Sequence, residues 1–196
     1  MQEARRTQEE RREATRAALL EAARKLFAEK GYAATGTPDI VAAAGVTRGA
    51  LYHHFADKLA LFEAVVEEEH RAVSQAITDI ADGAGAPPDM IDALVAGGDG
   101  FLAAMQDEGR RRIMLIDAPA VLGREALDRI NQRYGQRTLI EGVQCAVDAG
   151  VIGDVAVEPT AQLLGALFDR AALAPAGELD DYRAAMEQVI RGLRRR

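Results

Sequence analysis

Apolar residues recur at helical spacing along nearly the whole chain, and this is the feature that most limits its fold. Between Leu19 and Phe27 they occupy every third or fourth position, which places them on one face of a helix. Similar spacing continues to the C-terminal region, and no stretch shows polar–apolar alternation between hairpin turns. The sequence therefore predicts an all-α fold of about nine helices.

Glycine, proline and capping residues divide this pattern into separate helices. Glycine is typical of helix C-termini, whereas threonine and aspartate are typical N-caps. A long helix that Asp57 caps is expected over 57–81, with a length of about 37 Å at 1.5 Å per residue. A break rich in Gly and Pro follows at 82–89. Helix ends are expected at Gly31, Gly45 and Gly150, and N-caps at Thr37, Thr47 and Asp57. Later helices are expected at 90–105, 113–123, 124–149, 159–174 and 179–195, the second of them stopped near Pro119.

The composition indicates a folded chain without membrane-spanning helices. Apolar residues make up 48% and charged residues 28% of the 196 residues, and no run of about 18 apolar residues occurs. The N-terminus is charged from its start, unlike a signal peptide. The single cysteine, Cys145, cannot form an internal disulfide. We therefore expect a cytoplasmic protein.

Charge is distributed unevenly along the chain. Residues 1–60 carry ten Lys/Arg and eight Asp/Glu, a net charge of +2, whereas 61–196 carry fourteen and twenty-three, a net charge of −9. Only the first part suits a polyanion such as DNA. The sequence thus divides into a mildly basic part, 1–60, and an acidic part, 61–196.

Common enzyme and metal signatures do not occur in the sequence. Its three histidines, His53, His54 and His70, form no HExxH motif or Cys/His cluster, and no GxxxxGK[ST] loop occurs. Adjacent residues of a helix point about 100° apart, so His53 and His54 are poorly placed to share one metal ion. We expect no catalytic residue, no metal and no cofactor.

The segment VTRGALYHHF follows a helix and a glycine turn, which is the pattern of a helix-turn-helix. Thr47 and Arg48 place donors at the tip of the second helix, and Gly49 permits close approach to DNA. Leu51 and Phe55 lie one turn apart and are expected to face the core. An ordinary amphipathic helix with partly buried histidines is the alternative reading.

Polar residues on the flank of the same helix suit the phosphate backbone. Tyr52 lies one turn beyond Arg48, and its phenol can donate to a phosphate oxygen, with His53 and His54 beside it. Lys58 lies in the first turn of the next helix, where free backbone N–H groups also favour an anion. These residues extend the predicted DNA contact beyond the helix tip.

Residues 16–66 resemble the N-terminal domain of the TetR family of transcriptional regulators. The likeness includes LFAEKGY, DI-x-x-x-AGV and TRGALYHHF followed by Lys58. It departs at Gly36-Thr37-Pro38, where the family usually has a second Thr or Ser and then an apolar residue. LIDAPAVLG at 115–123 is similar to a segment common in one branch of the family. With the residue pattern, the resemblance implies DNA contacts at Thr35, Thr37, Thr47, Arg48, Gly49, Tyr52, His53, His54 and Lys58.

The resemblance also implies a helix-turn-helix DNA-binding domain over 1–60 and an effector-binding and dimerisation domain over 61–196. It further implies a homodimer that binds a near-palindromic DNA duplex and a small-molecule effector. Apolar residues of the predicted helices 159–174 and 179–195 suit a four-helix dimer interface. Leu163, Leu167 and Phe168 fit either the interface or an effector cavity, and the sequence leaves that choice open. The candidate cavity residues, each of which also suits a plain core, are His70, Phe101, Met105, Met114, Tyr134 and Phe168.

A repressor that a small apolar effector releases from its operator is the leading hypothesis, with an activator left open. The helix 57–81 would couple the two events, because it carries Lys58 beside the DNA and His70 inside the body. The alternative is a helical small-molecule-binding protein or enzyme with a vestigial DNA-binding module, and an interaction scaffold is a third. Specific duplex binding would support a regulator, whereas turnover abolished by a pocket mutation would identify an enzyme.

Overall fold

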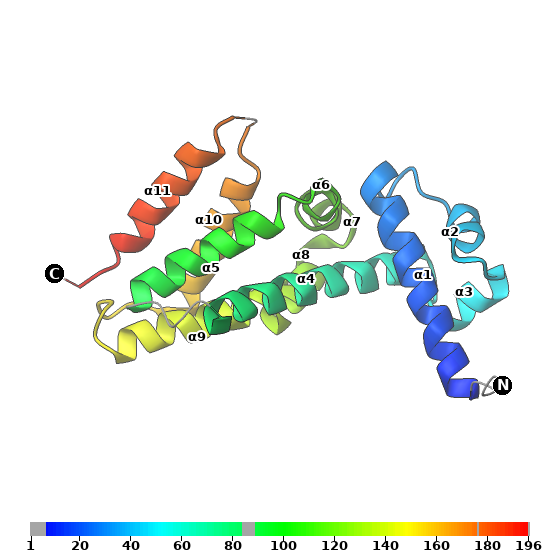
Figure 1. Cartoon of the computed structure of the whole chain (residues 1–196), viewed down its shortest axis with the longest axis horizontal. Coiled ribbons are helices and arrows are strands. Elements are labelled where there is room, and N and C mark those ends of the chain that lie inside the picture. The colour runs from blue at the N-terminus through cyan, green and yellow to red at the C-terminus, as the bar shows by residue number, and fades with distance from the viewer. Residues whose placement is uncertain (1–6, 84–88, 176, 196) are drawn as a thin grey trace.

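The computed structural model describes residues 7–83, 89–175 and 177–195, which are helical almost throughout (Figure 1). No helix in these ranges is both long and apolar enough to cross a membrane. The all-α prediction is confirmed. The elements are α1 (Gln8–Lys30), α2 (Thr37–Ala44), α3 (Arg48–His54), α4 (Lys58–Gly83), α5 (Met90–Ala104), α6 (Glu108–Arg111), the π-helical segment η1 (Arg112–Asp117), α7 (Ala118–Val121), α8 (Gly123–Arg133), α9 (Gly135–Asp148), α10 (Val157–Ala172) and α11 (Leu179–Arg191).

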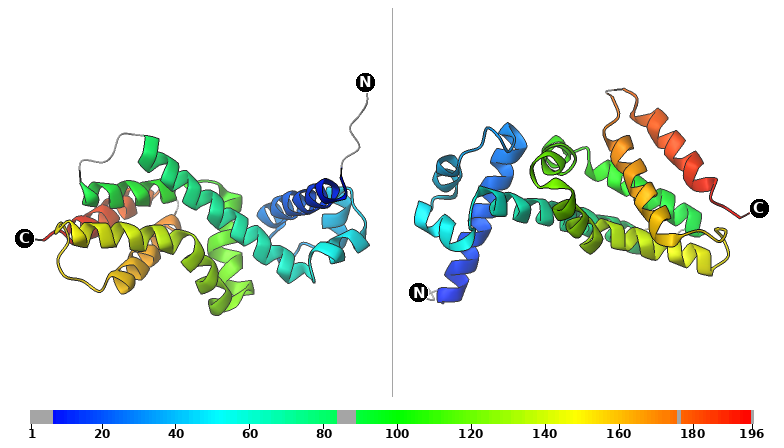
Figure 2. Two further views of the ribbon diagram at one scale, coloured as in Figure 1. Left: turned by 90° about the horizontal axis from the view of Figure 1, so that it is seen from below. Right: turned by 180° about the vertical axis from the view of Figure 1, so that it is seen from behind.

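The molecule is elongated, with the N-terminal helices at one end and the C-terminal helices at the other (Figures 1 and 2). Helices α1, α2 and α3 form the first end, and α5, α9, α10 and α11 gather at the second. Helix α4 extends from one end to the other and contacts elements of both. The two ends therefore share one continuous helix.

Most predicted boundaries in the first 60 residues are confirmed. Gly31 and Gly45 end α1 and α2 with φ of 82° and 65°, a region that glycine adopts readily. The side chains of Thr47 and Asp57 each accept a hydrogen bond from the amide three residues on, at 3.2 Å and 2.8 Å. The predicted N-cap at Thr37 is wrong, because Thr37 is itself the first helical residue and a glycine without a capping side chain precedes it.

The predicted single helix 124–149 is also wrong. It is divided into α8 and α9 at Tyr134, whose φ of −119° and ψ of −98° lie outside the helical region. Ile130 of α8 is buried with the N-terminal helices, whereas Val143 of α9 is buried with the C-terminal helices. The two halves thus pack against different cores, and the break at Tyr134 allows both.

Two further boundaries differ from the prediction. Pro119 does not stop a helix but lies in the first turn of α7, where a missing amide proton costs no intrahelical bond. Helix α11 ends at Arg191 rather than at 195, because the following residues pair with another segment. The amide of Arg195 donates to the carbonyl of Val151 at 2.8 Å, beside an antiparallel bridge between Ile152 and Arg194.

Buried side chains form two separate clusters. The first joins α1, α2 and α3 to the start of α4, and it includes Val66. The second joins α5, α9, α10 and α11 to the later part of α4, beginning at Val73. The proposed domain boundary at residue 60 therefore falls within α4, before the residues that complete the first cluster. The predicted break at 82–89 lies largely outside the described residues, and α5 begins with Asp89 as its N-cap.

Candidate nucleic-acid interface

Helices α2 and α3 meet in a tight turn at the N-terminal end of the molecule (Figure 1). In this turn the amide of Val46 donates to the carbonyl of Val41 at 3.1 Å, and Gly45 donates to Ala42 at 3.3 Å. Helix α3 begins two residues later, with the Thr47 side chain as its cap. The geometry is that of a helix-turn-helix.

The inner face of α3 is anchored in the first core. Leu51 and Phe55 are buried, as the sequence predicts, and Ile40 of α2 is buried with them. Phe27 of α1 and Phe62 of α4 complete the cluster, with ring centroids 5.0 Å apart in an edge-to-face arrangement. Three helices, α1, α2 and α4, therefore fix the orientation of α3, which leaves its opposite face free for a ligand.

The outer face of α3 carries a cation and a phenol side by side. Tyr52 is 43% exposed, and the guanidinium carbon of Arg48 lies 5.4 Å from the centre of its ring. The charge and donors of Arg48, and after it the Thr37 hydroxyl, lower the pKa of the Tyr52 phenol. The structure thus brings together three of the predicted DNA-contacting residues, from two helices, on one exposed surface.

Gly49 lies at the exposed start of α3 and has few neighbours. A β-carbon at this position would meet only the Thr47 hydroxyl, at 3.8 Å, which is an ordinary contact. Packing around Gly49 in the described chain therefore does not require glycine. Close approach of another molecule would require it, as the sequence interpretation proposes.

The two adjacent histidines have different surroundings. His53 is exposed, whereas His54 is partly buried beside α1, and their rings lie 5.4 Å apart. Burial lowers the pKa of His54, and the positive charges of His53, Arg12 and Arg16 lower it further. His53 therefore shares the exposed side of α3, and His54 faces a groove between α3 and α1 that Arg12 and Arg16 also line.

Arg12 and Arg16 of α1 are candidate contacts that the sequence interpretation missed. They lie one turn apart on α1, and the Arg16 guanidinium carbon is 5.5 Å from the centre of the Phe55 ring. Their spacing of four residues is a signal that could have placed both on one helix face. Glu9 and Glu13 line the same groove, so its charge is mixed.

Thr35 and Lys58 are placed differently from the other predicted DNA contacts. Thr35 is buried, and its hydroxyl lies 2.8 Å from the carbonyl of Gly31 and donates inside the fold. The Lys58 ammonium donates to the carbonyls of Tyr32 and Thr35, both at 3.0 Å, and lies 4.0 Å from the centre of the Tyr32 ring. Both side chains thus hold the loop between α1 and α2, and a direct DNA contact from either stays a prediction.

The candidate effector residues lie in or near the cores rather than around one described cavity. Met105, Met114 and Phe168 are buried in the second cluster, and Phe101 packs partly buried beside them, 6.3 Å from Phe168 between ring centroids. Phe168 thus faces the core, whereas Leu163 is 73% exposed. Tyr134 packs against the first cluster, so the structure does not bring it together with the others.

His70 is the polar member of the candidate effector set. It is partly buried on α4, and its Nε2 atom is shielded from solvent without a hydrogen-bond partner among the described residues. Burial lowers its pKa to about 4, while the neighbouring Glu69 charge acts in the opposite direction. Across the described residues, no group of three or more His, Cys, Asp and Glu side chains is arranged to hold a metal ion.

The fold and this surface define a helix-turn-helix DNA-binding protein with a separate helical body. Residues 19–65 match the family model described as bacterial regulatory proteins, tetR family. Residues 91–195 match the tetracyclin repressor-like C-terminal domain. The chain belongs to the TetR family of transcriptional regulators, which are DNA-binding proteins and not enzymes.

Curated relatives match mainly over the DNA-binding end. The HTH-type transcriptional regulator TtgR of Pseudomonas putida is 48% identical over 66 residues, which are 34% of this chain and 31% of TtgR. The Transposon Tn10 TetC protein of Escherichia coli is 30% identical over 130 residues, 65% of this chain and 62% of that protein. The matched stretch thus spans less than two thirds of either relative.

Solved structures match over nearly the whole chain. A TetR-family transcriptional regulator from Pectobacterium atrosepticum is 33% identical, with a TM-score of 0.75 over 97% of this chain and 99% of the other. RolR, solved in complex with resorcinol, is 20% identical, with a TM-score of 0.70 over 93% of this chain and 90% of RolR. The second likeness concerns the fold alone.

Proposed function

We propose that this chain is a homodimeric, cytoplasmic repressor that a small apolar molecule releases from its operator. The observation that carries the DNA-binding part is the exposed face of α3, where Arg48, Gly49 and Tyr52 lie opposite a fully buried anchor. A helix held in this way presents its N-terminal residues to the major groove of DNA. The repressor assignment draws support from relatives named as repressors, such as BepR of Brucella suis, 47% identical over 62 residues.

The exposed residues divide into two roles at the DNA. Arg48, with its forked guanidinium, suits the O6 and N7 acceptors of a guanine in the major groove. Tyr52 and His53 lie farther along α3 and suit phosphate oxygens, which position the protein without reading sequence. Thr35 and Lys58 act indirectly in this proposal, by holding the loop that leads into the helix-turn-helix.

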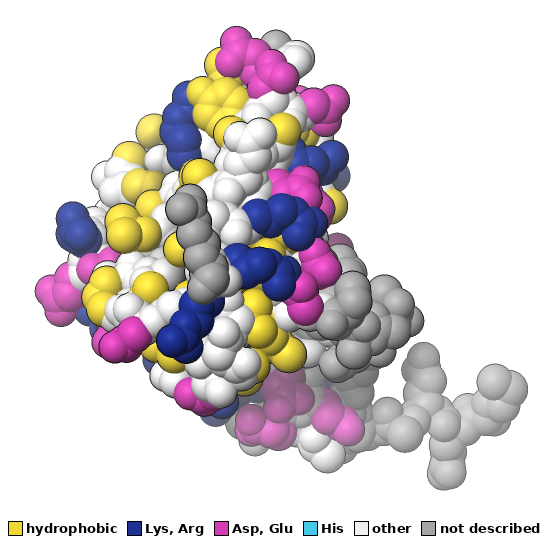
Figure 3. All heavy atoms as spheres, turned by 90° about the vertical axis from the view of Figure 1, so that its left-hand side faces the viewer, with side chains coloured by type: hydrophobic (Ala, Val, Ile, Leu, Met, Phe, Trp, Pro, Cys, Tyr) yellow, Lys and Arg dark blue, Asp and Glu magenta, His cyan; other side chains and the backbone are white. Residues whose placement is uncertain are grey.

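Exposed apolar side chains on α10 and α11 are the proposed dimer interface. Leu163 of α10 is 73% exposed and Val189 of α11 is 52% exposed, and both helices lie at the C-terminal end of the molecule. Figure 3 shows the end of the molecule that holds α11, where hydrophobic side chains reach the surface between Arg and carboxylate pairs. A second copy covering these side chains would form a four-helix contact and set the spacing of two α3 helices.

The proposed effector site lies where α4 passes the second core. Met105 and Met114 are buried there, and His70 offers a shielded nitrogen without a partner among the described residues. Methionine side chains are flexible and adapt to an incoming apolar ligand. A ligand at this place would displace the middle of α4, whose first turns belong to the DNA-binding end. The ligand shifts DNA affinity only by its preference between the two arrangements.

The test is selection of duplexes from a randomised library by the purified protein, followed by affinity measurements at several salt concentrations. We expect enrichment of a near-palindromic sequence, with log affinity falling by about 0.9 per phosphate neutralised for each unit of log salt. Half-sites about one or more helical turns apart would indicate a dimer. Binding without enrichment of any sequence would contradict the proposal and favour a vestigial DNA-binding module.

A further inference from the structure

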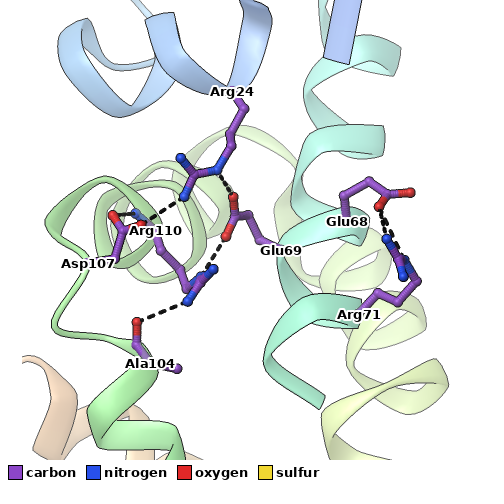
Figure 4. Close-up of polar contacts among 7 residues, drawn as sticks. All are labelled: Arg24, Glu68, Glu69, Arg71, Ala104, Asp107 and Arg110. Carbon is purple, nitrogen blue, oxygen red and sulfur yellow. Dashed lines mark hydrogen bonds and ion pairs between the residues drawn. The ribbon is translucent and has the colours of Figure 1, made fainter. Parts of the chain in front are cut away.

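A cluster of four charged side chains joins α1 to the C-terminal body in the middle of the molecule (Figure 4). Arg24 of α1 donates through Nε to Glu69 of α4 and through Nη2 to Asp107 at 2.9 Å. Arg110 of α6 donates through Nε to the other oxygen of Glu69 at 2.6 Å. One carboxylate of α4 thus bridges the guanidinium groups of α1 and α6.

Burial distinguishes this cluster from the other ion pairs on α4. The Glu69 side chain is only 5% exposed, so its charge depends on the two arginines rather than on water. Partial burial acts to lower the pKa of Arg24, but Glu69 and Asp107 outweigh it and raise that pKa. The nearby pair of Arg71 and Glu68 is exposed and lies within α4 alone (Figure 4). Such a surface pair contributes little and connects no other element.

The residues that follow the cluster hold the end of α1 as well. Arg112 donates to the carbonyls of Glu29 and Lys30 at 3.2 Å and 3.3 Å, where the negative end of the helix dipole favours a cation. Asp117 accepts a hydrogen bond from the amide of Tyr32 at 2.9 Å, at the start of the loop into α2. The segment 107–117 therefore forms hydrogen bonds with α1 at Arg24 and at its C-terminal end.

The same segment takes part in both hydrophobic cores. Ile113 is buried in the first cluster with the DNA-binding helices, whereas the next residue, Met114, is buried in the second. These two residues lie in η1, and π-helical turns are often found at functional sites. A change in the packing around Met114 would therefore displace neighbouring residues, such as Arg112, that are hydrogen-bonded to α1.

We propose that residues 107–117, here called the α6–η1 clamp, couple the C-terminal body to the DNA-binding end through the Arg24–Glu69 ion cluster. The clamp fixes the orientation of α1, and thereby of α3, in addition to the connection through α4. This inference rests on the proposed function, since its readout is DNA affinity. When the clamp contacts are lost, α3 takes up several orientations, of which only one binds DNA. The apparent DNA affinity then falls in proportion to the population of that orientation.

The experiment compares Arg24→Gln and Asp107→Asn with the matched control Arg71→Gln, using the duplex that the wild-type protein enriches. Asn keeps the N-cap of α6, which Asp107 supplies through the Arg110 amide. We expect both clamp variants to bind the duplex at least about fivefold more weakly, the lower range of typical coupling, and the control to bind like the wild type. A pure charge effect would act in opposite directions, because one variant removes a positive charge and the other a negative one.

Hydrogen–deuterium exchange supplies a readout that does not depend on DNA. We expect faster amide exchange at 24–35 in both clamp variants and no change in Arg71→Gln. Faster exchange with unchanged duplex affinity would overturn the coupling and leave the cluster a structural contact only. If Arg24→Gln fails to fold, Asp107→Asn decides, since its side chain is partly exposed and its loss leaves Glu69 paired. Failure of the wild type to enrich any duplex would instead contradict the proposed function.

Discussion

Gly98 of α5 lies directly against the ring of Phe168 on α10. A β-carbon at residue 98 would come within 2.9 Å of Phe168 Cε1, and within 3.0 Å of Met186 Cε on α11. At the preceding position, Gly97, the nearest atom would be 3.9 Å away, in Ile77. Close packing of three helices in the second core thus depends on the missing side chain at one glycine and not at its neighbour.

Alanine at these two glycines should change stability in opposite directions. Gly97→Ala relieves the entropic cost of glycine inside a helix and should stabilise the fold by about 0.5–1 kcal/mol. Gly98→Ala gains the same helix preference but forces the Phe168 ring to move, so overpacking should leave a net loss of about 1 kcal/mol. Urea unfolding of both variants measures the difference. A gain in stability from both would show that α10 and α11 yield freely.

Arg48→Ala and His53→Ala should separate base reading from phosphate contact. If Arg48 reads a guanine, its loss should reduce the preference for the selected duplex over random duplex by about 1–3 kcal/mol. His53→Ala should weaken both duplexes to a similar extent, since a phosphate contact carries no sequence information. Both residues are exposed, so neither change should unfold the chain. Equal losses on the two duplexes for Arg48→Ala would assign that residue to the backbone.

A charge at Leu163 should prevent dimerisation without damage to the core. Leu163 is 73% exposed on α10, and a buried interface with two facing carboxylates would be strongly unfavourable. We expect Leu163→Glu to sediment as a monomer and to lose specific duplex binding. Ile116→Glu is the matched control for the sedimentation measurement alone, because Ile116 is also exposed, at 53%, but lies on η1 within the clamp. A dimeric Leu163→Glu protein would place the interface elsewhere.

His70 should make the protein less stable as the pH falls below neutrality. Its pKa is lowered from 6.5 to about 4 by burial, so the folded chain keeps His70 neutral where the unfolded chain takes up a proton. The free energy of unfolding should therefore fall between pH 6.5 and 4, on the order of 1 kcal/mol per pH unit from this group. Above pH 6.5 His70 is neutral in both the folded and the unfolded chain, so its titration no longer lowers the free energy of unfolding.

Comparison with His70→Gln isolates that contribution from the carboxylates that also titrate in acid. We expect the variant to lose less stability than the wild type when urea unfolding is measured at pH 7, 5.5 and 4.5. Parallel pH profiles for the two proteins would show that His70 becomes charged in the folded state at its ordinary pKa.

Much of the DNA-binding end could be predicted from the sequence because the signals act over a few residues. The glycine at 45 and the caps at Thr47 and Asp57 locate the ends of helices by hydrogen bonds within four positions. The spacing of Leu51 and Phe55 likewise determines which side of α3 is buried. These local rules require no knowledge of distant partners.

Other features depend on partners that the sequence alone does not place. Helical spacing could not show that Lys58 turns toward the carbonyls of Tyr32 and Thr35, because that choice depends on how the loop closes over α4. The break at Tyr134 depends on two cores that attract the two halves of one expected helix.

The ion cluster is the clearest case of a feature decided by tertiary structure. Arg24 and Asp107 lie 83 positions apart in the chain, and each reads locally as an ordinary charged residue on a helix surface or at a helix start. Only the packing of α6 beside α1 and α4 buries Glu69 between two arginines. The sequence by itself determined the all-α class, the main helix ends near the N-terminus and which face of α3 is buried, since these follow from local periodicity and capping. The folded arrangement decided which charges lose their water, because burial depends on the whole set of helices that surrounds them.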